Sequence, residues 1–260
     1  MAIKKDPNKA FDELFQDDYF IYSPSDIDFP KKEYVNKLIA WLDVLGMSKK
    51  IIESGESISG AEVIITDIGK LRNCVENSCK ELLMQNKLEY IQLNDGFIIV
   101  SELDCINELC KILCEIQWKI LIEVKFLARG ALTAGQIIIS QDLKVIIGPA
   151  FIQAYKMEDE NAIFPRILFS DEIYRYIEKN NIEFPYIEED TDHFKYLDFL
   201  KYEYDLEDNS RNFDNKLKVH GIKKILKKYY SDNINKDKSI SQKYGWIINK
   251  LRMLGIKIIV

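Results

Sequence analysis

The 260-residue chain has few of the side chains on which histidine catalysis, zinc centres and disulfide frameworks depend. It contains only two histidines, His193 and His220, and its cysteines include no C-x-x-C pair. The five cysteines fall in two helix-like segments, at Cys74, Cys79, Cys105, Cys110 and Cys114. We therefore expect buried thiols in a reducing compartment rather than disulfides or zinc ligands.

The chain also lacks a long apolar run and a surplus of positive charge. No stretch approaches the roughly 18 apolar residues of a membrane helix, and the first residues lack the apolar segment of a signal peptide. The formal net charge of −6 does not suggest a nucleic-acid-binding surface. With 47% hydrophobic and 30% charged residues, the composition is that of a globular protein with a core. We expect a cytoplasmic protein with no membrane or nucleic-acid partner.

One carboxylate stands inside the most apolar stretch of the chain, residues 38–48. This run has the length of a strand buried on both faces, and a buried Asp43 is costly unless a cation or several donors compensate it. The Gly46-Met47-Ser48 sequence that follows can turn backbone N–H groups toward a phosphate. Taken alone, Asp43 is equally well explained as the turn or cap residue that ends a core strand.

Hydrophobic periodicity predicts the elements that follow. Asn94-Asp95-Gly96 separates two short apolar runs, which is typical of a hairpin, although such an Asp-Gly pair alone usually marks only a turn. The predicted strands cover 36–45, 89–93, 97–100, 125–132, 136–147 (joined to the previous strand through residues 133–135, with a break at 141–142) and a last strand at 166–169. The predicted helices cover 48–54, 61–85, 103–124, 148–158 and 171–179.

The first six principal elements have the order β-α-β-β-α-β, which predicts an α+β protein with a ferredoxin-like sheet. In that topology the end of the first strand and the turn of the hairpin lie side by side, so Asp43 and Asp95 would be neighbours. We divide the chain into an N-terminal tail (1–33), a catalytic domain (34–186) and a helical C-terminal region (187–260), where acidic and lysine-rich runs suggest solvated helix faces.

Two converging carboxylates repel each other unless cations lie between them, and oxygen ligands favour Mg²⁺ or Mn²⁺. Two such ions about 3.5–4 Å apart activate a hydroxyl and stabilise a leaving pyrophosphate. A reaction of this kind depends on positioning and charge neutralisation more than on covalent chemistry.

Several short motifs, taken together, resemble the class III nucleotidyl cyclases. Residues 41–48 are similar to the first metal-binding strand of that family, and Asp95 falls where the family carries its second metal aspartate. Residues 128–135 resemble its Arg-x-Gly-x-x-x-Gly strand, with Ala131 in place of one glycine. Together with residues 148–150, 154–158 and 164–167, this pattern most resembles the Pycsar cyclases, bacterial anti-phage enzymes that make cyclic UMP or cyclic CMP. The resemblance covers about residues 34–180.

The resemblance implies a head-to-tail homodimer with nucleotide sites at the interface. It places two Mn²⁺ or Mg²⁺ ions on Asp43, Asp95 and the Val44 carbonyl. The backbone of the turn after the first strand would hold the triphosphate, and this turn consists of Leu45, Gly46, Met47 and Ser48. Arg129 and Lys156 would be the cations near the triphosphate, although Arg129 is equally well explained as an interface or surface ion pair.

Departures from the family pattern bear on the substrate. The positions that read a purine base are occupied by Ile91 and Val145, which cannot hydrogen-bond a purine edge. The usual transition-state Asn and Arg fall at Ile152 and Lys156, and only the second keeps its charge. These features favour a pyrimidine cyclase, with UTP expected over CTP because that activity is commoner in the family. Its product would activate a separate effector in phage defence.

Two other classes of function stay open. A catalytically silent cyclase-like module could bind a nucleotide or a partner through its dimer face, and Ile152 supports this reading, whereas the two retained aspartates argue against it. A palm-type polymerase or a diguanylate cyclase uses the same topology and metal pair. Such a protein would carry a second acid next to Asp95, and this sequence has Gly96 there.

Overall fold

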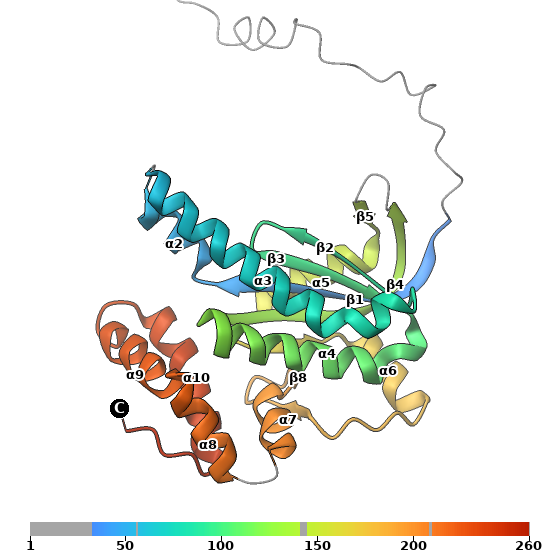
Figure 1. Cartoon of the computed structure of the whole chain (residues 1–260). Helices are drawn as coiled ribbons and strands as arrows, with labels where there is room; N and C mark the ends of the chain where they lie inside the picture. The colour runs from blue at the N-terminus through green and yellow to red at the C-terminus, as the bar shows by residue number, and fades with distance from the viewer. Residues whose placement is uncertain (1–32, 56, 141–144, 208–209, 260) are drawn as a thin grey trace, which may run out of the picture. The chain divides into compact units, whose positions relative to one another are not determined.

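A computed structural model describes residues 33–55, 57–140, 145–207 and 210–259 of the chain (Figure 1). All but the last residue of the predicted N-terminal tail lies outside the described residues. Residues 34–260 form one compact unit, so a separate catalytic domain at 34–186 stays a prediction. No helix within the described part of the chain is long and apolar enough to cross a bilayer.

The ferredoxin-like arrangement is confirmed. Six principal elements form this arrangement, and its four strands have the order β2-β3-β1-β4 across the sheet. Along the chain, a short helix, α2 (Met47–Ser54), lies between the first two elements. The six are β1 (Val35–Leu45), α3 (Ile58–Met84), β2 (Leu88–Leu93), β3 (Gly96–Ser101), α4 (Ile106–Lys119) and β4 (Leu127–Ser140). A 3₁₀ turn at Leu103–Cys105 precedes α4 and a π-helical turn at Ile120–Val124 follows it.

The predicted pair of strands at 125–132 and 136–147 is wrong. The chain does not turn at residues 133–135, because β4 pairs with β1 without interruption from Leu127 to Ile137, and Gly135 lies opposite Lys37 within that ladder. A glycine inside a strand therefore produced a false turn signal. The strand ends at Ser140, next to the predicted break, and β5 (Val145–Ile147) then pairs back onto β4.

The sheet is also wider than the sequence predicted. The strand near residue 166 is not the last, because two further three-residue strands extend the order to β4-β6-β8-β7. Such strands are too short for a period-two pattern, and the acidic composition of this segment resembled a solvated surface. The remaining elements are α5 (Pro149–Asn161), β6 (Ile167–Phe169), α6 (Asp171–Lys179), β7 (Ile187–Glu189), β8 (Lys195–Leu197), α7 (Phe199–Leu206), α8 (Ser210–Val219), α9 (Ile222–Asn233) and α10 (Lys238–Met253).

Alternation along β1 divides its side chains between two layers of the core. Leu38, Ala40, Leu42 and Val44 belong to the large core under α3 and α4, whereas Ile39 and Trp41 belong to a smaller core under α5. Figure 1 shows α3 and α4 across one face of the sheet and α5 on the other. Because side chains alternate between faces, Asp43 follows Trp41 onto the α5 face.

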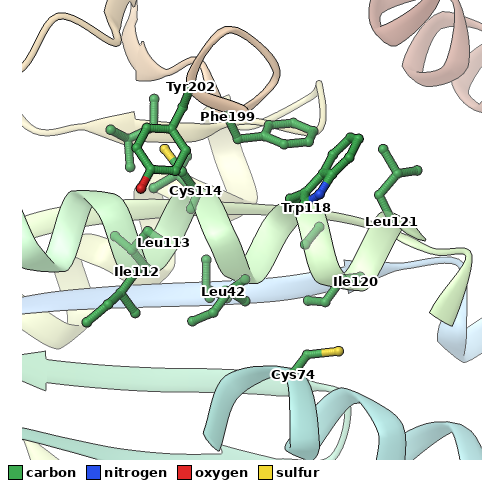
Figure 2. Close-up of a cluster of buried hydrophobic side chains, with 14 of the residues drawn as sticks. Leu42, Cys74, Ile112, Leu113, Cys114, Trp118, Ile120, Leu121, Phe199 and Tyr202 are labelled. Atoms are coloured by element: carbon green, nitrogen blue, oxygen red, sulfur yellow. The ribbon is translucent and has the colours of Figure 1, made fainter. Parts of the chain in front are cut away.

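The five cysteines are free and buried, as predicted from their spacing. Figure 2 shows α4 passing between the sheet and α7, with Cys114 and Trp118 among the apolar side chains that fill this layer. Burial raises the pKa of the Cys79 thiol to about 12 and that of Cys114 well above its ordinary value. These thiols therefore act as small apolar residues of the core.

Candidate active site

Asp43 lies near the carboxyl end of β1, on the face of the sheet covered by α5. The β1–β4 register places Asp43 directly opposite Arg129, and Arg129 Nε donates a hydrogen bond of 3.2 Å to Asp43 Oδ2. The Asp43 side chain keeps 27% of its surface accessible. A carboxylate in an apolar strand is thus compensated by a cation from the neighbouring strand, while one side stays open to a ligand.

Asp95 lies in the two-residue turn between β2 and β3. The β1–β3 ladder ends with the pair Leu42–Phe97, so continuing that register places Asp95 beside Val44 at the same sheet edge as Asp43. Burial raises the pKa of Asp95, and the charge of Asp43 raises it further, although a backbone hydrogen bond opposes the shift. The two predicted metal aspartates are therefore close enough to repel each other.

Arg129, the cation that pairs with Asp43, also contacts α5 and the residue that follows it. Arg129 Nε lies 2.6 Å from Glu158 Oε1 without the alignment of a hydrogen bond. Trp41 Nε1 donates a 3.1 Å hydrogen bond to Glu158 Oε2, and Arg129 Nη1 donates one of 3.0 Å to the Ala162 carbonyl. Burial raises the pKa of Glu158, while Arg129 opposes that rise. One guanidinium is therefore shared by two carboxylates.

The turn after β1 leads directly into the start of α2. Gly46 adopts φ 93° as the N-cap of α2, a left-handed conformation that is strained for residues with a Cβ. No side chain caps this helix start, so the amides of its first turn are available to an acceptor. Met47 is buried, while Ser48 is exposed. The role of Leu45, Gly46, Met47 and Ser48 in triphosphate binding stays a prediction.

The other predicted site residues do not meet Asp43 within one chain. Lys156 is exposed on α5 and lines a shallow surface with Ile152. It precedes Glu158 by two positions, which places the two side chains on different faces of the helix. Ile91 lines a cavity of about 490 Å³ beside β2, and Val145 is exposed at the start of β5. Any action of Lys156 on an Asp43 site would therefore have to come from a second copy.

Asp43, Asp95 and the Val44 carbonyl can be compared with the ligands that Mg²⁺ or Mn²⁺ requires. No group of three or more His, Cys, Asp or Glu side chains that could hold a metal ion occurs among the described residues, so the set resembles no closed zinc site. Two aspartates at one sheet edge suit Mg²⁺ or Mn²⁺, which keep several waters and use one or two carboxylates together with substrate phosphates. The register that brings Asp95 beside Val44, next to Asp43, is the observation that favours a cation here. The residues fit the group.

Sequence analysis missed Glu158 as a site residue. A signal was present, because Ala150, Ala154 and Glu158 recur at four-residue spacing and are the buried residues of α5. A carboxylate on the buried stripe of a helix needs a partner, and here the partners are Arg129 and Trp41.

Lys243 was also missed. It comes from α10, about 200 residues after Asp43, and no local pattern connects the two. Burial lowers the pKa of Lys243 and Arg129 lowers it further, whereas Asp237, Asp43 and Glu158 raise it. The C-terminal helices therefore bring a positive charge to the candidate site.

Comparison with known proteins finds matches among solved structures but none in searches by sequence. No protein-family model matches the chain, and no curated protein matches it by sequence. Among solved structures, it is similar to the guanylyl cyclase domain of the RhoGC fusion protein from the aquatic fungus Blastocladiella emersonii. The identity is 17% and the TM-score 0.45, over 58% of this chain and 86% of that chain.

Two further solved structures match this chain with similar identities and TM-scores. The guanylate cyclase domain of RhGC from Catenaria anguillulae, solved in complex with GTP, is 17% identical with a TM-score of 0.46, over 64% and 94% of the two chains. The adenylyl cyclase CyaB from P. aeruginosa is 14% identical with a TM-score of 0.43, over 64% and 96%. Similarities at this level assign no activity to the chain. The functional argument therefore depends on the residues of the site.

Proposed function

We propose that the protein is a metal-dependent pyrimidine nucleotide cyclase that converts UTP to 3′,5′-cyclic UMP and pyrophosphate. The observation that carries this proposal is the placement of Asp43 and Asp95 at one sheet edge, beside an uncapped helix start. Few structural needs require two mutually repelling carboxylates at the edge of an apolar core, whereas binding of divalent cations does.

In the proposed reaction, the ribose 3′-oxygen attacks the α-phosphorus. The bond from that phosphorus to the bridging oxygen breaks, pyrophosphate leaves, and the hydroxyl proton passes to solvent. Divalent cations held by Asp43, Asp95 and the Val44 carbonyl would supply Lewis-acid charge that makes the hydroxyl more acidic and stabilises the leaving group. The amides of residues 45–48 would orient the triphosphate, and Arg129 would neutralise charge beside it.

The pyrimidine preference rests on apolar side chains at the two base-reading positions of the resemblance, Ile91 and Val145. A purine edge bound against them would leave its donors and acceptors unpaired. Nothing in these residues distinguishes uracil from cytosine, so a cytidylate cyclase is the first alternative. The role in anti-phage defence, with a separate effector that responds to the product, comes from the resemblance alone.

A homodimer fits the exposed side chains around α5. Ile147, Ile152 and Tyr155 each expose about half of their surface on adjoining parts of β5 and α5, and burial against a second copy would remove this apolar surface from water. The same face carries Lys156, which in the proposed dimer would act on the site of the partner.

A silent nucleotide-binding module is the second candidate. The observation in its favour is the Arg129–Asp43 hydrogen bond, because a guanidinium already compensates one of the two carboxylates that a metal ion would need. In this case the protein would bind nucleotide without turnover.

The test is incubation of the purified protein with each of the four ribonucleoside triphosphates and Mn²⁺, with products resolved by chromatography and mass. We expect a cyclic pyrimidine monophosphate. Asp43→Asn should reduce its formation at least about a thousand-fold, because several kcal/mol of charge stabilisation are lost. Asp232→Asn, at an exposed carboxylate of α9, is the matched control. Metal-dependent nucleotide binding without turnover would support the silent module instead.

A further inference from the structure

A positively charged cavity lies between the turn after β1 and the C-terminal helices. It has a volume of about 360 Å³ and is bordered by Leu45 and Gly46, by residues of the loop before β4, and by α9 and α10. The charged side chains around it are four lysines and one glutamate: Lys49, Lys50, Lys125, Lys243 and Glu53. An anion would enter this cavity favourably.

Two other hollows among the described residues show no such excess of lysines. A cavity of about 620 Å³ beside α6 has the opposite charge, with one lysine, Lys195, against several glutamates. The surface near Lys156 likewise combines this lysine with Glu160, Asp171 and Glu172. The lysines around the first cavity are therefore not explained by the general surface of a protein with a net charge of −6.

The lysines of the cavity differ in how firmly they are held. Lys50 forms an ion pair with Asp67, Lys49 approaches Glu53 at 3.8 Å, and the Lys125 ammonium donates a hydrogen bond to a backbone carbonyl. Lys243 has no ion-pair partner among the residues that the structure describes, although it is half-buried. Asp237, Asp43 and Glu158 act on it only from beyond ion-pair distance. A partly desolvated ammonium group without a contacting counter-ion costs free energy unless a ligand supplies the charge.

The position of Lys243 links the cavity to the carboxylates. Its ammonium group interacts electrostatically with Asp43, Arg129 and Glu158, and it lines the same cavity as Gly46, the N-cap of α2. A group bound at the two aspartates could therefore extend into the cavity past Gly46. A nucleoside triphosphate has this form, since its β- and γ-phosphates continue away from the reacting α-phosphorus.

We infer that Lys243 binds the terminal phosphates of the nucleotide and the pyrophosphate product, with Lys50 and Lys125 forming the other walls of the cavity. This inference rests on the proposed function for the identity of the nucleotide. It assigns the C-terminal helices a direct part in substrate binding. Lysine is a common phosphate ligand because its ammonium group acts as a compact point charge with three donors.

The experiment measures binding of inorganic tripolyphosphate to the full chain by calorimetry, with and without Mg²⁺. Tripolyphosphate has no ribose and cannot be cyclised, so the result does not depend on turnover. Lys243→Gln should weaken binding about ten-fold or more, since a hydrogen bond between charged groups is lost. Lys243→Arg should restore binding to within a few-fold. Lys238→Gln, at an exposed lysine of the same helix, should leave it unchanged.

The outcomes separate this inference from the proposed function. Tripolyphosphate binding that depends on Lys243, in a protein that turns over no nucleotide, supports the inference and contradicts the cyclase proposal. Cyclase activity with an unchanged KM in Lys243→Gln supports the cyclase and overturns the inference. Equal tripolyphosphate affinity in the wild type and Lys243→Gln, or no binding by the wild type, also overturns it. Because Lys243 has no ion pair to lose and its charge is partly desolvated, Lys243→Gln should unfold at the wild-type temperature or above it.

Discussion

Two arginines, Arg129 in β4 and Arg166 just before β6, each face two carboxylates, yet their surroundings differ. Arg166 is fully buried; its Nη1 lies 2.5 Å from Asp190 Oδ2, and its Nη2 pairs with Asp192. The rings of Phe164 and Tyr196 flank its guanidinium at 5.2 and 5.5 Å. Arg129 keeps 20% of its side chain accessible and contacts the buried Glu158 and the partly exposed Asp43 of the candidate site. The guanidinium is closed to water in one cluster, which we call the closed cluster, and partly open in the other, the open cluster.

The pKa shifts of the carboxylates follow this difference. Burial opposes the charge of Asp190, but the Thr191 amide, the Trp246 indole and Arg166 together hold its pKa below the ordinary value. In the open cluster, burial raises the pKa of Glu158 despite Arg129. The closed cluster therefore pairs Arg166 with two carboxylates, as a structural ion pair requires, although Arg166 Nε has no hydrogen-bond partner among the described residues. In the open cluster the pKa of Glu158 stays raised although Arg129 contacts it, and such shifts are common at sites that bind a ligand.

The largest expected effect is on stability, and it compares what Arg166 and Arg129 each contribute to the folded state. Arg166→Met should lower the free energy of unfolding by about 3 kcal/mol, because the fully buried guanidinium loses two ion pairs and Asp190, which is 15% exposed, loses its cation. Arg129→Met is the matched variant and should cost about 1 kcal/mol, since Asp43 is partly solvated and Glu158 keeps the Trp41 donor. Urea unfolding followed by circular dichroism measures both. Equal losses would mean that the two clusters do not differ in structural role.

A smaller effect is expected at the acid that holds Arg129 from α5. Glu158→Gln removes one of the two negative partners of Arg129, so the guanidinium should pair more strongly with Asp43 and compete with a cation there. The affinity for Mn²⁺, followed by electron paramagnetic resonance, should fall about ten-fold, which corresponds to the loss of one favourable charge interaction.

Glu160→Gln, at an exposed acid of the same helix, should leave the Mn²⁺ affinity unchanged. An unchanged affinity in Glu158→Gln as well would show that Glu158 only packs against Trp41 and does not regulate the charge at Asp43.

The smallest effect concerns Asp95. Because its pKa is raised in the folded state, the folded protein binds the Asp95 proton more tightly than the unfolded chain does. The stability that this proton contributes is complete below the unfolded pKa and is lost as the pH rises through the folded pKa. Asp95→Asn does not titrate, so it should gain stability relative to the wild type between pH 3 and pH 7.

Thermal unfolding across this pH range measures the difference, with Asp232→Asn as an exposed control. A gain in stability accompanied by loss of cyclase activity would identify Asp95 as a residue retained for function at a cost to stability. A constant difference at all pH values would contradict the raised pKa.

Local pattern was sufficient to predict the first strand, the hairpin and the helices between them. It therefore also placed Asp43 near the end of one strand and Asp95 in the turn before its neighbour, since that follows from topology. Glu158 and Lys243 could not be placed in the same way, because their positions depend on how α5 and α10 pack against the sheet. The strands β7 and β8 were missed because three-residue strands carry no periodicity, and their pairing is decided by tertiary contacts.

The long ladder between β1 and β4 has an evolutionary consequence. Eleven consecutive pairs fix Arg129 opposite Asp43, and successive residues of a strand alternate between faces. A single-residue insertion or deletion within β4 on either side of Arg129 would shift part of this ladder and turn one set of side chains to the wrong layer of the core. Lineages descended from this protein should therefore vary in length at the ends of β4 and hardly at all within it.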